Sequence, residues 1–438
     1  MGLDALRKKI ETKTAKLGVI GLGYVGLPVA ALFAEKGFSV VGIDLKQTRI
    51  EMINAGKSPI EGEEPGLEEL ISDVVKSGRL RATTDYDALK DADVVLIDVE
   101  TPVNDDHVPE YAALRSALKS LSQVLKEGAL VVVESTIMPG TMEKIVRPLL
   151  EKETGRAAGK GFLLGNCPER VMPGKLLKNL RSMSRIAGGD SEATAETMAM
   201  LYRHAVEADV DTTDWITAEI VKTAENTYRD VQIAFANEVA LICEALGADV
   251  WAVREFVRKS PGRDMLFPGA GVGGHCIPKD PWLLASSVAD ADVPIRLIPA
   301  ARAINSGMPA HVFRLIEGKL GNLEGKKVLI LGYAYLQDSD DTRNSPSADL
   351  EDLLTEAGAA VVVHDPYIAG FDGDVYAMAD ECDIAVLMTA HGQYKGLDLA
   401  KMTKALKNPV MVDGRNLLDG EKASAAGLTL VRLGVGSA

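Results

Sequence analysis

The chain has 438 residues, with 48 Lys and Arg against 63 Asp and Glu, which gives a formal net charge of −15. This length excludes a small disulfide-stapled scaffold and allows several domains with their own cores. The negative charge argues against non-specific binding to nucleic acid or anionic membranes, so neither partner is expected.

The cysteines and the apolar segments indicate where in the cell the protein is expected. Four cysteines occur singly, which indicates a reducing cytoplasm rather than a disulfide framework. No apolar run reaches the roughly 18 residues of a membrane span, and residues 1–16 form a charged stretch without a signal-peptide core. We therefore expect a cytoplasmic protein.

From Lys16 onward, short β-branched segments alternate with helical patterns. The expected strands are 17–21, 39–44, 93–99, 129–135 and 162–165, and the clearest helical patterns are 28–36 and 111–125. This alternation predicts a parallel, doubly wound sheet. The pattern is expected to stop near Gly188.

Two helical segments follow, at 193–206 and 214–246, and the second has no Gly or Pro before a predicted C-cap at Gly247. Its apolar residues cover more than one stripe, which predicts burial between domains or subunits. These residues are Trp215, Ile216, Ile220, Val221, Tyr228, Val231, Ile233 and Phe235. We expect a central helical hinge and dimer region.

Strand patterns return at 326–332, 359–365, 383–388 and 409–413. The predicted fold is therefore α/β, with two Rossmann-like domains joined by a central helical region that contains one long helix. The predicted domains are an NAD-binding domain at 1–200, a helical and dimerisation region at 201–312, and a C-terminal domain at 313–438.

A glycine motif follows the first predicted strand. Gly21, Gly23 and Gly26 form GxGxxG at the start of a helix, and Asp44 ends the next strand at the spacing expected for a carboxylate that binds ribose hydroxyls. Pyrophosphate would then lie at a helix N-terminus. Asp44 favours NAD over NADP, although Lys46 and Arg49 lie nearby.

The second α/β segment lacks this motif. Its first turn is Gly332-Tyr333-Ala334-Tyr335, without a second glycine. A tightly held second dinucleotide is therefore not expected there, and a different ligand, or none, belongs to this domain.

The densest local signal is PGAGVGGHCIPKDP at 268–281. Its glycines permit close backbone approach, and Pro278 is typical of the first turn of a helix, so Cys276 is expected just before a helix N-terminus. That position, with Lys279 nearby, favours a reactive thiolate, and Asp280 could orient water. Cys167, Cys243 and Cys382 are interpreted as small buried residues, and the six histidines show no metal-ligand spacing, so no metal is expected.

Lys222, Asn226 and Arg229 form a polar stripe along the long predicted helix. The stripe is either a solvated face or a substrate-facing one, in which Lys222 could stabilise an oxyanion or relay a proton. A nicotinamide site together with an activated cysteine suggests aldehyde oxidation through a thiohemiacetal and a thioester. If one site performs both oxidations, an alcohol becomes a carboxylate and two NAD are consumed.

The motifs taken together resemble one family over nearly the whole chain. They are GLGYVGLP (21–28), ESTIMPGT (134–141), NCPERVMPG (166–174), VKTAENTYRD (221–230), GAGVGGHCIPKDP (269–281) and GYAY…DDTRNSP (332–346). They look like the UDP-glucose/GDP-mannose dehydrogenases, which oxidise C6 of nucleotide sugars. The resemblance implies an NAD-binding domain, a dimerising helical region and a C-terminal domain that binds the UDP-sugar.

The resemblance also assigns roles to individual residues. It implies catalytic roles for Cys276, Lys222, Asn226, Asp280, Glu169 and Thr136. It implies cofactor contacts for Gly21, Gly23, Tyr24, Val25, Gly26, Asp44, Arg49, Thr101, Ser135 and Arg343. It implies substrate contacts for Arg170, Val171, Arg229, Phe267, Gly271 and Gly273.

Within the family, GGHCIPKDPW and CPERVMPG look most like enzymes for UDP-N-acetylhexosamines, with UDP-N-acetylmannosamine favoured and UDP-N-acetylglucosamine next. Pro173 and Leu336 depart from common family residues. The alternatives are a UDP-glucose 6-dehydrogenase, a two-electron hydroxyacid dehydrogenase without covalent catalysis, and a regulatory NAD-binding module. A homodimer or higher homo-oligomer is expected.

Overall fold

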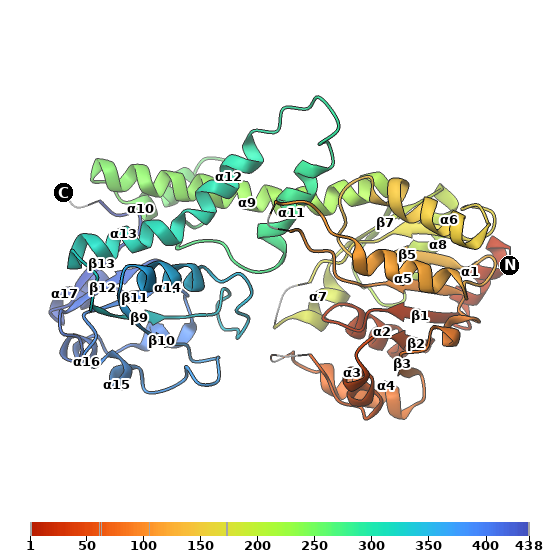
Figure 1. Ribbon diagram of the computed structural model, residues 1–438, viewed down its shortest axis with the longest axis horizontal. Helices are drawn as coiled ribbons and strands as arrows, with labels where there is room; N and C mark the ends of the chain where they lie inside the picture. Colours follow the sequence, from red (N-terminus) through yellow and green to blue (C-terminus); the bar gives the residue numbers. More distant parts are fainter. Residues whose placement is uncertain (1, 61, 63, 105, 172–173, 437–438) are drawn as a thin grey trace. The chain divides into compact units, whose positions relative to one another are not determined.

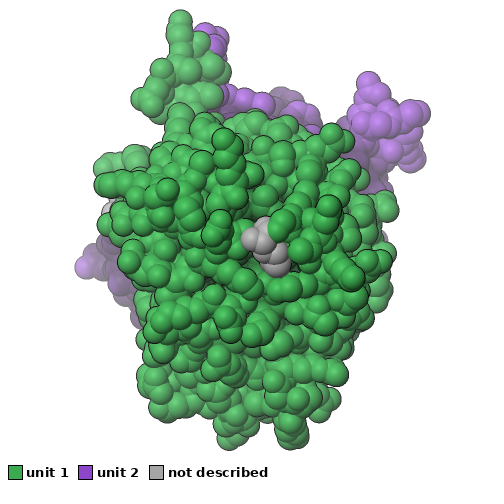
Figure 2. Space-filling model, turned by 90° about the vertical axis from the view of Figure 1, so that its right-hand side faces the viewer, with its two compact units in different colours: residues 1–225, 282–293 green, residues 226–281, 294–438 purple. Residues whose placement is uncertain are grey.

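The computed structural model describes all residues except 1, 61, 63, 105, 172–173 and 437–438. The chain divides into two compact units (Figures 1 and 2). The first comprises residues 1–225 and 282–293, and the second comprises residues 226–281 and 294–438. The predicted boundaries at 200 and 312 follow a different division and stay a prediction.

The first unit contains an eight-stranded sheet in the order β3-β2-β1-β4-β5-β6-β7-β8. Figure 1 labels β1, β2, β3, β5 and β7 of this sheet. The strands are β1 (Lys16–Ile20), β2 (Ser39–Ile43), β3 (Leu80–Thr83), β4 (Val94–Ile97), β5 (Leu130–Val133), β6 (Leu163–Asn166), β7 (Arg185–Gly189) and β8 (Val210–Asp214). All neighbours are parallel except β6 and β7. The order from β3 to β6 is that of a dinucleotide-binding fold, which confirms the predicted Rossmann-like domain.

The central strands are apolar on both faces, so their side chains enter two separate cores. Val94 and Leu96 pack with one group of helices, and Val95 and Ile97 pack with the other. The first group is α1 (Leu3–Glu11), α2 (Gly26–Glu35), α3 (Gln47–Asn54), α4 (Leu67–Lys76), α7 (Leu176–Ser182) and α8 (Glu192–Tyr202), and the second is η1 (Tyr86–Leu89), α5 (Ala112–Ser122), η2 (Met142–Val146) and α6 (Arg147–Thr154). Burial on both faces explains the continuous β-branched runs.

The second unit contains a parallel five-stranded sheet in the order β10-β9-β11-β12-β13. Its strands are β9 (Lys327–Leu331), β10 (Ala360–His364), β11 (Ile384–Leu387), β12 (Val410–Asp413) and β13 (Thr429–Arg432). Helices α13 (Met308–Leu320) and α14 (Pro346–Glu356) cover one face, and α15 (Val375–Ala379), α16 (Leu399–Ala405) and α17 (Gly420–Ala425) cover the other. The predicted second α/β domain is confirmed.

The longest helix is α9 (Trp215–Leu246), with 32 residues. Asp214 caps it by accepting the Thr217 N–H at 2.9 Å, and it ends at Gly247, whose φ of 73° confirms the predicted C-cap. The remaining helices are α10 (Val250–Val257), α11 (Cys276–Ser286), α12 (Leu297–Ser306) and η3 (Gly392–Gly396). In the part of the chain that the structure describes, no helix combines the length and apolar character needed to span a bilayer.

Two predictions about the elements were wrong. The strand pattern does not stop near Gly188, because β8 follows α8 and pairs with β7. Its sequence, VDTTD, lacks the apolar run that marks the central strands. Helix α11 begins at Cys276 rather than at Pro278, because a proline is tolerated anywhere in the first turn, where the N–H groups have no partner within the helix.

Candidate functional site

The three glycines of the GxGxxG motif, Gly21, Gly23 and Gly26, differ in what surrounds them. Gly21 has a φ of 93°, and a Cβ at Gly26 would lie 1.9 Å from the Gly21 carbonyl oxygen. A Cβ at Gly23 would have no atom within 4 Å. The first glycine therefore makes the turn, the third allows close packing, and the second leaves open space, as a bound pyrophosphate requires. Tyr24 follows and donates its hydroxyl to Glu64, and Val25 immediately precedes α2.

Asp44 lies directly after β2 and is 8% exposed. It accepts the N–H groups of Leu22 at 3.0 Å and Lys46 at 2.9 Å, and it pairs with Arg49 at 2.8 Å. The carboxylate thus braces the glycine turn, and Arg49 lies beside it. These residues fit a dinucleotide at the carboxyl edge of the sheet.

Substitutions at the glycines separate binding from folding. We expect Gly26→Ala to destabilise the domain, because its methyl group would overlap the backbone of Gly21. Gly23→Ala is expected to leave the melting temperature nearly unchanged and to weaken NAD binding about tenfold or more, because the added methyl group occupies the space for the phosphates. Thermal unfolding and NAD titration of both variants would test this contrast, and equal losses of stability would contradict it.

Polar side chains join the loops that follow β4 and β5. Thr101 Oγ1 donates to the Thr136 carbonyl oxygen at 2.6 Å, and Ser135 Oγ donates to the Val99 carbonyl oxygen at 2.6 Å. Thr101 and Ser135 are buried, whereas Thr136 is half-buried. The structure therefore brings these three predicted residues together at one edge of the sheet.

Glu169 lies beyond β6 and is 7% exposed. It pairs with Arg185, whose Nη1 also lies 3.3 Å from Glu134 Oε1. Burial lowers the pKa of Arg185, but the carboxylates of Glu169 and Glu134 more than offset this, so the pKa lies above its ordinary value. Arg185 is therefore a fixed cation between two buried carboxyl groups.

The next residues in the chain are also held in the first unit. Arg170 donates to the Ser184 carbonyl oxygen at 3.0 Å and pairs with Glu225 at 3.0 Å. Val171 packs against the apolar core. Pro173, the first departure from the family pattern, lies outside the described residues.

Asn226 and Asp280 meet in the second unit, although 54 residues separate them. Asn226 Nδ2 donates to Asp280 Oδ2 at 2.5 Å, and Lys279 Nζ lies 3.6 Å from Asp280 Oδ1. Asp280 is fully buried and Lys279 is 7% exposed. Of the predicted polar stripe on α9, Lys222 is buried and Arg229 is exposed, so the stripe is not simply a solvated face.

Cys276 is the first residue of α11, and its side chain is exposed. Cys167, Cys243 and Cys382 are buried, as predicted, and all four are thiols rather than disulfides. Burial raises the pKa of Cys167 to about 12. Only Cys276 therefore combines exposure with a helix N-terminus, the setting that favours a reactive thiolate.

The glycines before Cys276 pack against the chain's own C-terminal domain. A Cβ at Gly273 would lie 2.6 Å from the Asn344 carbonyl oxygen, and one at Gly274 would lie 2.7 Å from the Tyr335 ring. A Cβ at Gly271 would lie 2.8 Å from Pro346. The close approach predicted for these glycines is thus made by loop 333–346.

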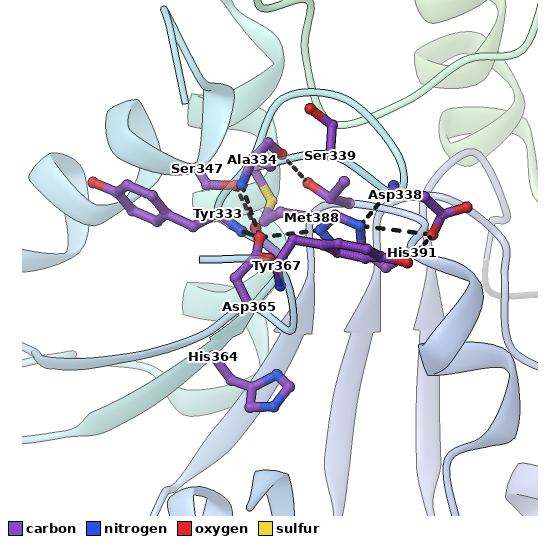
Figure 3. Close-up of polar contacts among 12 residues, drawn as sticks. Tyr333, Ala334, Asp338, Ser339, Ser347, His364, Asp365, Tyr367, Met388 and His391 are labelled. Atoms are coloured by element: carbon purple, nitrogen blue, oxygen red, sulfur yellow. Dashed lines mark hydrogen bonds and ion pairs between the residues drawn. The ribbon is translucent and has the colours of Figure 1, made fainter. Parts of the chain in front are cut away.

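This loop is fixed at both ends. Arg343, which pairs with Asp341, accepts the Gly274 N–H at 2.9 Å through its carbonyl oxygen. At the other end, Asp365 accepts the N–H groups of Tyr333 and Ala334 at 2.7 and 2.9 Å, as Figure 3 shows.

His391 braces the same loop. Its Nε2 lies 3.0 Å from Asp365 Oδ2, and its Nδ1 accepts the Asp338 N–H at 2.9 Å (Figure 3). Asp365 is fully buried. The carboxylate that follows β10 therefore binds its own turn, as Asp44 does, but its side-chain partner is the buried His391 rather than an arginine. Leu336, the second departure from the family pattern, lies on this loop and is half-buried.

Phe267 is 61% exposed and lies beside Trp251, while the Arg254 guanidinium lies 3.5 Å from the centre of its ring. Among the described residues, no group of three or more His, Cys, Asp or Glu side chains could hold a metal ion.

Sequence reasoning missed Asp98, Glu134, Arg185, Tyr335 and Asn344. Asp98 and Glu134 directly follow the apolar strands β4 and β5, and that position could have identified them. The other three depend on tertiary contacts.

Comparison with known proteins places these features in a family. Residues 15–206, 216–307 and 329–420 match the NAD binding domain, the central domain and the UDP binding domain of the UDP-glucose/GDP-mannose dehydrogenase family. The UDP-N-acetyl-D-mannosamine dehydrogenase of Pyrococcus horikoshii is 39% identical over 407 residues, which cover 92% of this chain and 96% of that protein.

Solved structures agree with this match. The structure of UDP-D-ManNAc dehydrogenase from Pyrococcus horikoshii has a TM-score of 0.90 and 37% sequence identity. The match covers 97% of this chain and 100% of that chain. The NDP-N-acetyl-D-galactosaminuronic acid dehydrogenase from Methanosarcina mazei has a TM-score of 0.87 and 39% identity, and covers 99% of this chain and 98% of its own.

Proposed function

The chain belongs to the UDP-glucose/GDP-mannose dehydrogenase family, and we propose on that basis that its substrate is UDP-N-acetylmannosamine. It is an NAD-dependent oxidoreductase with a UDP binding domain. In the proposed reaction, the C6 alcohol becomes a carboxylate, two NAD are reduced, and one water is consumed. The observation that supports covalent catalysis is the exposed Cys276 at the start of α11, in the same unit as the Asn226–Asp280 pair.

The glycine turn and Asp44 would hold NAD, which would supply the hydride acceptor for both oxidations at C6. Between them, the Cys276 sulfur adds to the aldehyde carbon and gives a thiohemiacetal, whose oxyanion a cationic group such as Lys222 could stabilise. Loss of the second hydride leaves a thioester on Cys276. Water then adds to the thioester carbon, the bond to sulfur breaks, and the thiol and the uronate are released.

We assign the buried carboxylates of Asp280 and Glu169 to orienting the groups that react or exchange protons. Asp280 is held by Asn226 and lies near Lys279, so it could orient the attacking water or the ammonium group of a lysine. Glu169 lies in the other unit with Thr136, and we assign both to the sugar. The cofactor contacts are assigned to the glycine turn, Asp44, Thr101 and Ser135.

The yield of NADH per nucleotide sugar tests this function. With limiting UDP-N-acetylmannosamine we expect two NADH per substrate and a uronate product. UDP-N-acetylglucosamine, UDP-N-acetylgalactosamine, UDP-glucose and GDP-mannose serve as separate comparisons. Two NADH with another sugar alone would overturn the substrate assignment, and one NADH per substrate would overturn the double oxidation.

We also propose that the chain forms a homodimer through α9. Six large apolar side chains of this helix are 39% to 77% exposed: Ile216, Ile220, Tyr228, Phe235, Ile242 and Leu246. At about 100° per residue they fall within an arc of about 120°, so they form one face. An exposed apolar face of this length favours association with a second copy.

Charge substitution on this face tests the dimer. The double variant Phe235→Glu and Ile242→Glu is expected to be monomeric in sizing with light scattering, because association would bury four new carboxylates per dimer. Met52→Glu is the control, since Met52 is 40% exposed but lies on α3. A dimer that survives the double substitution would contradict the α9 interface.

Two further assignments follow from the same proposal. The four thiols, one of them exposed, suit the reducing cytoplasm. We assign cofactor binding to residues 1–200, dimerisation and the reactive thiol to 201–312, and UDP-sugar binding to 313–438.

A further inference from the structure

The first unit contains a group of ionisable side chains at the carboxyl ends of β4 and β5. Asp98 follows β4 and Glu134 follows β5, and both carboxyl groups are buried together with Arg185, Glu169 and the Tyr202 hydroxyl. Three carboxylates and one guanidinium would carry a net charge of −2. Burial of charge without compensation is costly, so this group requires either a further cation or a bound proton.

The hydrogen bonds show where a proton is needed. Glu134 Oε1 accepts from Tyr202 at 2.7 Å and from Arg185 at 3.3 Å, whereas no donor among the described residues reaches Glu134 Oε2 or either oxygen of Asp98. Asp98 and Glu134 are nevertheless neighbours at the edge of the sheet, because they directly follow the paired residues Ile97 and Val133, and the Glu134 N–H donates to the Ile97 carbonyl oxygen at 2.9 Å. Their two carboxyl groups therefore interact directly. Two acceptors in contact can form a hydrogen bond only if one of them carries a proton.

We propose that Asp98 is a buried carboxylic acid that donates its proton to Glu134, and that this acid pair is a proton site of the folded enzyme. Glu134 is the anionic member, because Arg185 and Tyr202 already donate to it. Burial, and secondly the charge of Glu134, raise the pKa of Asp98 well above its usual range. The cluster then carries a net charge of −1.

The same strand provides the matched control. Asp93 immediately precedes β4, is 1% exposed, and accepts from Lys126 at 2.7 Å, Lys9 at 2.9 Å and the Lys16 N–H at 3.0 Å. Burial acts to raise the pKa of Asp93, but the hydrogen bonds from Lys126 and Lys9 lower it below its usual value. The side chain of Asp93 and the carboxyl group of Asp98 are therefore buried at the two ends of one strand. Asp93 is ionised, whereas the proposal makes Asp98 protonated.

The acid pair has a consequence for Glu169, which rests on the proposed function. If Asp98 lost its proton, a second negative charge beside Glu134 would draw Arg185 away from Glu169. The proton on Asp98 thus positions Arg185, and through it the carboxylate assigned to the sugar. Asp98 and Glu134 are positioning residues and do not touch the reacting atoms.

Infrared spectroscopy tests the proton site without any turnover. At neutral pH the difference spectrum between the wild type and Asp98→Asn is expected to contain the C=O stretch of a protonated carboxylic acid, whereas the difference for Asp93→Asn contains only carboxylate bands. Absence of the C=O band in the Asp98 difference would overturn the proposal. If Asp98→Asn does not fold, the same band is followed in the wild type, where it must vanish at alkaline pH.

Stability gives a second, independent measurement. A group with a raised pKa in the folded state stabilises it at acid pH, and this contribution is lost as pH rises toward the folded pKa. The melting temperature of the wild type minus that of Asp98→Asn should therefore decrease as pH rises. The melting temperature of the wild type minus that of Asp93→Asn should instead decrease as pH falls, because a group with a lowered pKa in the folded state gives stability that is lost as pH falls. Equal slopes for both variants would contradict the assignment.

The alkaline side of the pH profile of kcat tests the positioning role. We expect it to shift to higher pH in Asp98→Asn, because an amide cannot lose the proton. An unchanged alkaline side would overturn the positioning role. An inactive wild type would overturn the proposed function, while the infrared and stability measurements would still decide the proton site.

Discussion

Cys276→Ala is expected to abolish uronate formation and to lower kcat for acid production at least about a thousandfold, because no other group can form the thioester. Among the cysteines only Cys276 is exposed. The measurement is the rate of uronate release by mass spectrometry, together with NADH yield. Any residual NADH should accompany aldehyde rather than acid.

Cys243→Ala is the control for this experiment. Cys243 is 4% exposed on α9, so its replacement removes a buried sulfur without touching the proposed chemistry. Its kcat should stay near that of the wild type. Full acid production by Cys276→Ala would exclude the covalent route. One NADH per substrate in the wild type would instead favour a two-electron dehydrogenase that uses a lysine.

Arg185→Met is expected to lower the free energy of unfolding by about 3–5 kcal/mol, because it leaves buried carboxylates without their cation. Arg185 is 5% exposed, and it pairs with both Glu134 and Glu169. Urea unfolding at neutral pH measures the loss. The loss should shrink at mildly acid pH, because protonation then neutralises the carboxylates.

A partly exposed ion pair provides the control for Arg185→Met. Arg181 pairs with Glu35 at 2.9 Å, but the two side chains are 33% and 34% exposed. Arg181→Met should therefore cost less than about 1 kcal/mol and show little pH dependence. If Arg185→Met behaved like this surface variant, the buried cluster would not depend on its arginine.

The strands that could be predicted are those buried on both faces. The sequences VVLI of β4 and LVVV of β5 are continuous apolar runs because both sides of each strand enter a core. Strand β8 was missed because its side chains are mostly exposed and its sequence is polar. A pattern of apolar residues can reveal burial, but it carries no signal for an exposed strand at a sheet edge.

The site could be predicted only where a local motif fixes local geometry. The spacing of Gly21, Gly23 and Gly26 determines a turn, and the structure confirms its geometry. The contact between Asn226 and Asp280 could not be predicted, because it joins residues 54 positions apart. Likewise, the sequence around Arg185 gives no local sign that it pairs with Glu134 and Glu169, which follow two other strands.

The packing of Gly271, Gly273 and Gly274 against Pro346, Asn344 and Tyr335 limits how this part of the gene can vary. Every codon change that replaces one of these glycines adds a Cβ where another segment of chain already lies. A substitution before Cys276 can therefore persist only together with a compensating change in loop 333–346. The two segments are expected to evolve as one unit, although about 60 residues separate them along the chain.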